Sequence, residues 1–403
     1  MKNLVTAFGI NNWKLVLLIN LKLFSMKTKV YTLLKPMFFC ALISIAFSCK
    51  KDPAKDLPEK KMNDSIVSEN KDATLKPAGP APAWAPNIKP EMAVVIEKLG
   101  TLGGKPIETL DAKEARLQPT PTDAVMAVMK DHNMTMPVPL CDTIGKDIPV
   151  TGGKTHIRIY TPKAGKAPFP VVVYYHGGGF VIADINVYNG GAQGLCEQTG
   201  AIVVSVEYPK GPEKKFPAAH NVAFDAYQWV LKNAASFNGN AAKIAVAGES
   251  AGGNLAANVS LMARDKKIMV PLYAILVYPV ANNDMTTESY TKYAMAKPLN
   301  KAMMGWFVKN YLANEAQSAD PRISLVKANL KGFPPTLIIG AEIDPLQSEG
   351  KLLADKLKDA SVETDYKLYD GVTHEFFGMA AVVPEAKDAQ GLAAKKLKSA
   401  LGL

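Results

Sequence analysis

The stretch that decides the fold of this chain is IAVAGESAGG, residues 244–253. Its first four residues are small and apolar, which is typical of a short buried strand, and they lead directly into a serine between glycines. Gly248 and Gly252 carry no Cβ, so they permit a sharp turn from a strand into a helix. The stretch therefore predicts a nucleophile elbow presenting Ser250. A small-residue turn without function is the alternative, and other parts of the chain must decide between them.

A serine hydroxyl is a weak nucleophile unless a base takes its proton, and His374 is the candidate base. In α/β hydrolases the acid and the histidine follow the serine in that order along the chain. Of the five histidines (His132, His156, His176, His220 and His374), only His374 follows Ser250. It comes after the strand-like residues 366–369 and an expected turn at Asp370-Gly371. We therefore predict that His374 is the general base.

The acid that would orient the imidazole is expected after the preceding strand. The apolar run 336–339 leads into Asp344, with Pro345 stopping the strand, 30 residues before His374. Glu342 is the competitor, but it falls within the strand run, and Asp370 is too close to His374 in sequence. Asp344 could instead serve only as a helix cap. Its placement favours the role of the acid that fixes the imidazole.

A second glycine-rich segment predicts an oxyanion hole. The sequence HGGGF, residues 176–180, directly follows the buried-strand run 171–175. Glycines leave their N–H groups accessible to a developing negative charge. A phosphate-binding loop is excluded because the Lys-Ser/Thr ending is missing. We expect donors from Gly177 and Gly178, completed by the amide of Ala251 after the nucleophile.

The rest of the chain alternates strands with helices. Apolar strand runs occur at 171–175, 201–206, 244–247, 272–277 and 336–339, with helical patterns at 224–235 and 346–357. Such alternation predicts a mainly parallel sheet with helices on both faces. Helical patterns between 90 and 130 precede this alternation, and the stretch 282–312 interrupts it as an inserted helical segment.

The combination of HGGG with GESAGG, residues 248–253, resembles the bacterial hormone-sensitive-lipase-like esterases of the α/β-hydrolase fold. The resemblance extends from about residue 90 to the C-terminus. It implies a helical cap from 90–130 and 282–312, a Ser250, Asp344 and His374 triad, small or short-acyl ester substrates and no cofactor. Two departures put the pocket shape in doubt. Residues 209–211 are Pro-Lys-Gly where the family has Arg-Leu-Ala, and Glu375 follows the histidine where the family has glycine.

Three other functions compete with carboxylesterase activity. A carbohydrate or aryl-ester deacetylase, or an amidase, would use the same triad. A binding protein on the same fold is the third, since plant hormone receptors that resemble this family have lost the histidine. This chain keeps His374 together with Ser250 and Asp344, which argues against that third function.

Composition excludes other classes. The net charge of +10 comes largely from residues 1–49, which hold six lysines and no acid. Without them 41 basic residues face 37 acidic ones, a balance of +4 with no basic stripe, so nucleic-acid binding is not expected. No metal-binding spacing of cysteine or histidine occurs. Cys141 and Cys196 are expected to be buried small apolar residues.

The N-terminal residues predict targeting. Residues 1–48 form a signal region in which a basic segment from Met26, the alternative start, precedes a 12-residue apolar run ending at Phe47. Cys49 resembles the lipidated first residue of a bacterial lipoprotein, and an uncleaved anchor is the alternative. Residues 49–89 are rich in Pro and Lys and predict a tether to the domain at 90–403. We expect a lipid-anchored extracytoplasmic or secreted protein that meets the membrane only through this N-terminus.

Overall fold

The computed structural model describes residues 75–403, so the predicted signal region, Cys49 and the first part of the tether lie outside the described residues. An eight-stranded sheet runs in the order β1-β2-β4-β3-β5-β6-β7-β8. Only the pairs β1–β2 and β2–β4 are antiparallel. The strands are β1 (Cys141–Val150), β2 (Gly153–Pro162), β3 (Phe169–Tyr175), β4 (Ile202–Val206), β5 (Gly239–Glu249), β6 (Ala274–Val277), β7 (Thr336–Ile343) and β8 (Thr364–Thr373).

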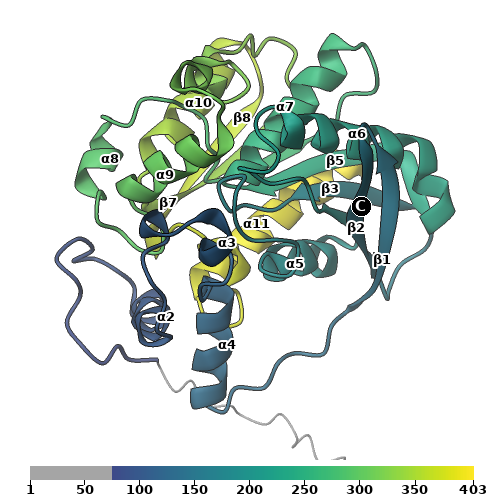
Figure 1. Ribbon diagram of the computed structural model, residues 1–403. Coiled ribbons are helices and arrows are strands. Elements are labelled where there is room, and N and C mark those ends of the chain that lie inside the picture. The colour runs from purple at the N-terminus through teal and green to yellow at the C-terminus, as the bar shows by residue number, and fades with distance from the viewer. Residues whose placement is uncertain (1–74) are drawn as a thin grey trace, which may run out of the picture. The chain divides into compact units, whose positions relative to one another are not determined.

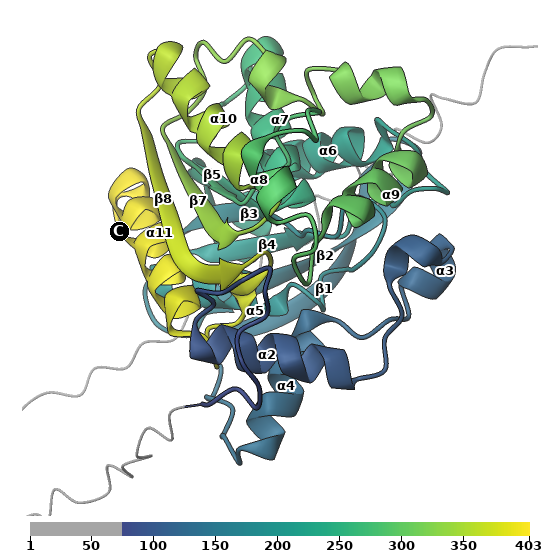
Figure 2. The same cartoon turned by 90° about the vertical axis from the view of Figure 1, so that its left-hand side faces the viewer.

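Helices cover both faces of this sheet, as Figures 1 and 2 show. Along β3, Val171 and Val173 face one apolar cluster while Val172 and Tyr174 face the other. This alternation follows from the two-residue period of a strand. The first face packs on α6 (Ala218–Asn233), α7 (Ala251–Asp265) and α10 (Gln347–Asp359), and the second on α5 (Asn189–Thr199) and α11 (Pro384–Leu401). The predicted α/β-hydrolase fold class is confirmed.

Two further groups of helices lie outside this layered pattern, at the segments expected to form a cap. The first holds α2 (Pro90–Thr101), η1 (Ile107–Thr109), α3 (Ala112–Ala115) and α4 (Pro121–Asp131). The second holds α8 (Glu288–Lys292) and α9 (Lys301–Tyr311). The groups contact each other, because the Trp306 indole N–H donates to the Leu110 carbonyl at 3.0 Å and the Asn300 amide donates to Glu108 at 3.3 Å. We call these two groups the cover.

The structure differs from the sequence predictions at three places. The antiparallel hairpin β1–β2 was not predicted, because most of β1 is exposed and lacks a clear apolar alternation. Strand β8 continues through Asp370-Gly371, where we expected a turn, with irregular pairing between Ala341 and Ile343 of β7. Residues 75–89, expected as the end of the tether, pack on the domain: Ala85 is fully buried and the Lys89 N–H donates to the Gly371 carbonyl at 2.8 Å.

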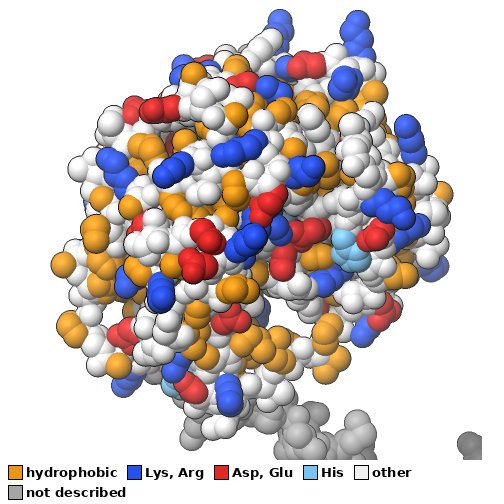
Figure 3. Space-filling view, in the orientation of Figure 1, with side chains coloured by type: hydrophobic (Ala, Val, Ile, Leu, Met, Phe, Trp, Pro, Cys, Tyr) orange, Lys and Arg blue, Asp and Glu red, His pale blue; other side chains and the backbone are white. Residues whose placement is uncertain are grey.

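Other features of the described residues agree with the composition. Cys141 and Cys196 are buried free thiols, as predicted. Positive and negative side chains are interspersed on the face drawn in Figure 3, without a basic stripe. Between residues 75 and 403, no helix has both the length and the apolar character needed to span a bilayer.

Candidate active site

Ser250 directly follows strand β5 and begins the turn into α7, as the elbow motif predicted. Its backbone has φ 57° and ψ −118°, a conformation that residues with a side chain rarely adopt. The flanking glycines are explained by close packing. A Cβ on Gly248 would lie 2.1 Å from the Gly252 carbonyl oxygen, and one on Gly252 would lie 2.0 Å from the Tyr175 carbonyl oxygen. The turn therefore needs glycine on both sides to present the serine.

His374 and Asp344 meet Ser250 because each directly follows the end of a parallel strand, β8 and β7 respectively. The His374 Nε2 atom lies 2.9 Å from the Ser250 Oγ atom, and His374 Nδ1 lies 2.6 Å from Asp344 Oδ2. The other carboxylate oxygen of Asp344 accepts the Leu346 N–H at 2.8 Å, which fixes the side chain. All three side chains are at most 5% exposed. The structure thus joins the three predicted residues in one hydrogen-bonded chain.

The competing acid Glu342 does not contact His374. It lies within β7 and accepts hydrogen bonds from the Asn87 amide at 2.7 Å and the Gly371 N–H at 2.8 Å. Glu342 still lies within β7, whereas Asp344 stands in the turn after the strand has ended, so the two side chains need not point to the same place. Glu342 therefore ties residues before α2 to β8, and Asp344 is the acid next to the imidazole.

The carboxylates around His374 favour the protonated imidazole, although burial opposes it. Burial lowers the pKa of His374, but the charge of Asp344 and its hydrogen bond raise it, and the net shift is upward from the ordinary value. Such a group accepts a proton readily from a neighbouring hydroxyl. The ring also packs against Tyr278, with centroids 4.5 Å apart, which holds its orientation.

Glu249, which directly precedes Ser250, is linked to His374 through Tyr278, since it accepts the Tyr278 hydroxyl and the Tyr278 ring packs on the imidazole. Its carboxyl group is buried and is hydrogen-bonded by the hydroxyls of Tyr174 and Tyr278. Burial raises its pKa to about 7, because the charged form loses its hydration. Sequence reasoning did not assign a role to Glu249 or Tyr278, although Glu249 lies inside the motif that was singled out. Their partnership depends on tertiary contacts between β5 and the residue after β6.

The glycine loop after β3 lies beside the serine, and its three glycines differ in whether they line the pocket. The pocket is lined by Gly178 and Gly179, not by Gly177. Gly177 instead accepts the Tyr208 hydroxyl at 3.0 Å through its carbonyl, while Gly178 and Gly179 have φ of 95° and 58°. Within residues 75–403 the N–H groups of Gly178 and Gly179 donate no hydrogen bond. Gly178 and Gly179 therefore bring two unpaired amides to the lining of the pocket that holds Ser250.

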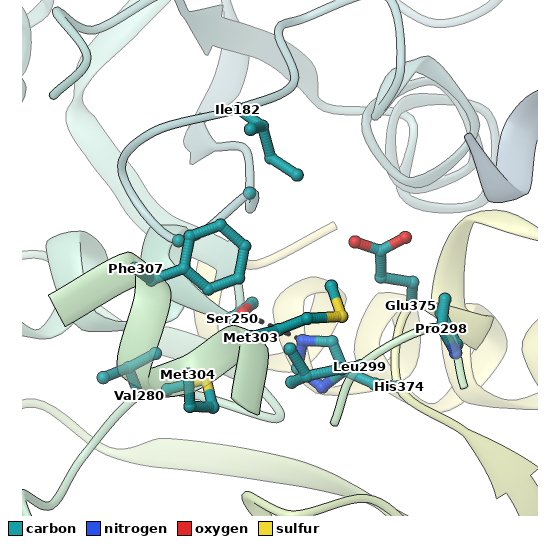
Figure 4. Close-up of a pocket in the computed structure, with 12 residues that line it drawn as sticks. Ile182, Ser250, Val280, Pro298, Leu299, Met303, Met304, Phe307, His374 and Glu375 are labelled. Atoms are coloured by element: carbon teal, nitrogen blue, oxygen red, sulfur yellow. Dashed lines mark hydrogen bonds between the residues drawn. The ribbon is translucent and has the colours of Figure 1, made fainter. Parts of the chain in front are cut away.

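Helix α9 of the cover forms one wall of the pocket, which has an empty volume of about 340 Å³ that includes open solvent (Figure 4). Figure 4 shows Ser250 and His374 near its centre, with Met303, Met304 and Phe307 projecting from α9. The remaining wall is mostly apolar and is formed by Ile182, Val280, Pro298, Leu299 and the carboxylate of Glu375. An adjoining apolar pocket shares Gly179, Val280, Met304 and Phe307 with it. The helical pattern of 282–312 predicted a segment here, but not which side chains would line the site.

No cluster of three or more metal-ligating side chains occurs in the described part of the chain. The arrangement offers a serine hydroxyl, a base within hydrogen-bond distance, an acid that orients the base and two unpaired amides. These are the parts required for attack on a carbonyl carbon and for holding the resulting oxyanion.

Comparisons with known proteins agree with this geometry. Residues 172–378 match the model of a family described as alpha/beta hydrolase fold. A carboxylesterase, NlhH, of Mycobacterium tuberculosis is 35% identical over 249 residues, which cover 61% of this chain and 78% of the relative. An ethyl acetate hydrolase of Pseudomonas putida is 29% identical over 317 residues, covering 75% of this chain and 96% of the relative.

Solved structures extend the likeness to three dimensions. A hyperthermophilic esterase from the archaeon Pyrobaculum calidifontis superposes with a TM-score of 0.71 and 35% identity, covering 78% of this chain and 98% of that one. The matched region contains the elbow, the glycine loop, Asp344 and His374. The chain belongs to the hormone-sensitive-lipase-like family of the α/β-hydrolase fold and is a carboxylic ester hydrolase.

Proposed function

We propose that this enzyme hydrolyses small carboxylic esters with short acyl groups through an acyl-enzyme intermediate on Ser250. The observation that carries the proposal is the unbroken hydrogen-bonded chain from Ser250 through His374 to Asp344, with contacts of 2.9 Å and 2.6 Å. This is the geometry that converts a weak hydroxyl into a nucleophile.

In the first half of the reaction, the Ser250 oxygen attacks the ester carbonyl carbon while its proton passes to His374 Nε2. The resulting tetrahedral oxyanion collapses, the carbon–oxygen bond to the alcohol breaks, and the imidazolium gives its proton to the leaving oxygen. A water molecule then attacks the acyl carbon with His374 again taking the proton, and Ser250 leaves as the restored hydroxyl. Asp344 holds the imidazole tautomer and stabilises the imidazolium.

The oxyanion would rest on backbone amides. Gly178 and Gly179 line the pocket with unpaired N–H groups, and the Ala251 amide adjoins the nucleophile. Compared with our sequence prediction, Gly179 takes the place of Gly177, while Gly178 and Ala251 remain. Preorganised amides of this kind stabilise the charge that develops in the transition state.

The preference for short acyl groups is supported by the pocket and by the relatives. Met303, Met304 and Phe307 stand close over the serine and leave an empty volume of about 340 Å³ that also includes open solvent. The related Pseudomonas putida protein is named for the hydrolysis of ethyl acetate, an ester with a two-carbon acyl group. A short acyl chain fits such a pocket, whereas a longer one would meet the side chains of Met304 and Phe307 on α9.

The test is a series of p-nitrophenyl esters of increasing acyl length, measured beside the matched p-nitroanilides with the full chain. We expect kcat/KM to be highest for acetate and butyrate and to fall steeply for longer chains. Faster turnover of anilides than of esters would contradict the ester preference and favour an amidase. No turnover of any member of the series would contradict the mechanism.

We also propose that the enzyme works in the cell envelope, attached through lipid on Cys49. The support is the order of basic segment, 12-residue apolar run and cysteine in residues 26–49, which lie outside the described structure. Cys49→Ser should move activity from the membrane fraction to the soluble fraction in a bacterial host, with Cys40→Ser as the matched control. Retention of the Cys49→Ser protein in the membrane would contradict lipid anchoring and favour an uncleaved anchor.

A further inference from the structure

Glu375 is a carboxylate in the pocket that the proposed reaction does not use. It directly follows His374 and lines the pocket. Figure 4 shows its carboxylate pointing away from the imidazole, on the side of the pocket toward Ile182. The carboxylate therefore lines the pocket away from the reacting groups, where a part of the substrate other than the scissile bond could contact it.

The backbone at this position would suit glycine better. Glu375 has φ 67° and ψ 8°, in the left-handed region that side chains disfavour. The esterases that this chain resembles commonly have glycine after the histidine. Strained residues in a pocket point to a functional constraint, because the surrounding structure has to maintain them. The presence of a long acidic side chain here therefore calls for a reason within the pocket.

Within residues 75–403 no lysine or arginine pairs with the Glu375 carboxylate, and its cationic neighbour His374 carries charge only when it is protonated. The Glu375 Oε1 atom accepts the Tyr188 hydroxyl at 2.9 Å, and no ion pair includes it. Burial raises its pKa, because the pocket hydrates the charged form less well than water does. Apart from Ser250 and His374, the other lining side chains are apolar. A cation brought by the substrate would supply the missing partner and lower the cost of burying the carboxylate.

We propose that Glu375 makes this enzyme prefer esters that carry a positively charged group, such as a quaternary ammonium, near the scissile bond. The proposal rests on the proposed function, since it assumes that the ester carbonyl binds at Ser250. The preferred substrates are thus defined by their positive charge. Glu375 acts on recognition of the substrate, while Ser250, His374 and Asp344 perform the bond chemistry.

Matched ester pairs test this preference. Butyrylcholine and 3,3-dimethylbutyl butyrate differ in the charge of the alcohol but hardly in its shape. Phenyl esters of trimethylglycine and of 3,3-dimethylbutanoic acid place the same difference on the acyl side. For each pair the ratio of kcat/KM, cationic over neutral, is measured in the wild-type enzyme and in Glu375→Gln. Comparing the two ratios cancels the intrinsic reactivity of the esters.

We expect the ratio for at least one pair to fall about tenfold in Glu375→Gln, the size of one hydrogen-bonded charge contact. Glu363→Gln, which removes an exposed carboxylate, is the matched control and should keep the wild-type ratio. Glu375→Gly, the residue common in the family, should lower the ratio as Gln does. Equal ratios in wild type and both Glu375 variants for both pairs would overturn the proposal.

A measurement on the wild-type enzyme alone guards against poorly folded variants. Choline should inhibit hydrolysis of p-nitrophenyl acetate with an inhibition constant about tenfold lower than that of 3,3-dimethylbutanol. Equal inhibition constants, together with equal ester ratios, would overturn the charge preference while leaving the reaction on Ser250 intact. Failure of the proposed reaction would look different, because neither ester of a pair would be turned over.

Discussion

The carboxyl edge of the sheet and the cover that closes it are built in different ways. At the edge, Ser250, Asp344 and His374 each follow a parallel strand and are held by hydrogen bonds, with at most 5% of each side chain exposed. The cover contributes Met303, Met304 and Phe307, whose apolar side chains pack without such directional bonds. The difference suggests that the sheet sets the reaction and the cover sets which ester is accepted. Changes at the edge should therefore cost turnover, and changes in the cover should alter preference.

The largest effect is expected from Ser250→Ala. Without the hydroxyl there is no acyl-enzyme, and kcat should fall by about 10⁶, as in serine hydrolases with the same arrangement. The melting temperature should hardly change, since only one oxygen is lost. Ser260→Ala, in the buried part of α7 where the hydroxyl bonds the Ala256 carbonyl, is the control and should keep its activity. Full activity in Ser250→Ala would refute the elbow as the source of the nucleophile.

Asp344→Asn comes next and tests the acid at the edge. An amide at this position no longer favours the correct imidazole tautomer, so kcat should fall about 10⁴-fold. Glu342→Gln is the matched control, because Glu342 bonds Asn87 and Gly371 rather than His374. If steady-state kinetics show the large loss in Glu342→Gln and not in Asp344→Asn, the assignment of the acid is reversed.

Gly179→Ala affects the contact between the edge and the cover. A Cβ on Gly179 would lie 2.3 Å from the Phe307 ring, and the φ of 58° is strained for alanine. Displacing this amide should lower kcat about 10²-fold with little change in KM, as expected for the loss of an oxyanion donor. In the double variant Gly179→Ala/Phe307→Ala, part of the loss should return if the clash causes it. Wild-type kcat in Gly179→Ala would exclude this amide as a donor.

Phe307→Ala tests the cover by itself. Phe307 lies in the wall between the main pocket and the adjoining apolar one, so its removal should admit longer acyl chains. We expect the kcat/KM ratio of octanoate to acetate esters to rise about tenfold, the effect of a few methylene groups in an apolar pocket. Lys309→Ala, an exposed position of α9 that is absent from both linings, should leave the ratio unchanged. An unchanged ratio in Phe307→Ala would mean that the acyl chain lies elsewhere.

The smallest effect is a shift in the pH profile. His374 must be neutral to accept the serine proton, so kcat/KM should fall as pH drops and reach half its plateau at the pKa of His374. Burial lowers that pKa, but the charge of Asp344, its hydrogen bond and the nearby carboxylates Glu375 and Glu249 together outweigh burial, so the midpoint should lie above about 6.5, the ordinary value for histidine. Stopped assays with a neutral ester from pH 5 to 9 would reveal it. A midpoint below the ordinary value would show that burial dominates.

The positions of Ser250, Asp344 and His374 were predictable from sequence, because each of them directly follows a strand. The end of such a strand is marked in the sequence by the end of an apolar run. Asp344 and His374 were located in this way. Sequence cannot tell which glycines of the loop line the pocket, because that depends on φ values that all glycines permit. The hairpin β1–β2 was missed because an exposed edge strand shows little alternation of apolar residues. Likewise, the role of Glu249 depends on Tyr278, which is distant in sequence.

The hydrogen bonds of Glu342 have a practical consequence for shortening the chain. The side chain of Glu342 joins Asn87 to Gly371, which places residues before the first helix against the two strands that precede Asp344 and His374. Leu75 and Ala85 are buried in the same region. A recombinant enzyme trimmed at residue 90, where the helical pattern begins, would lose these contacts and uncover apolar surface beside the acid and the base. The useful cut for producing the catalytic domain by itself therefore lies before Leu75.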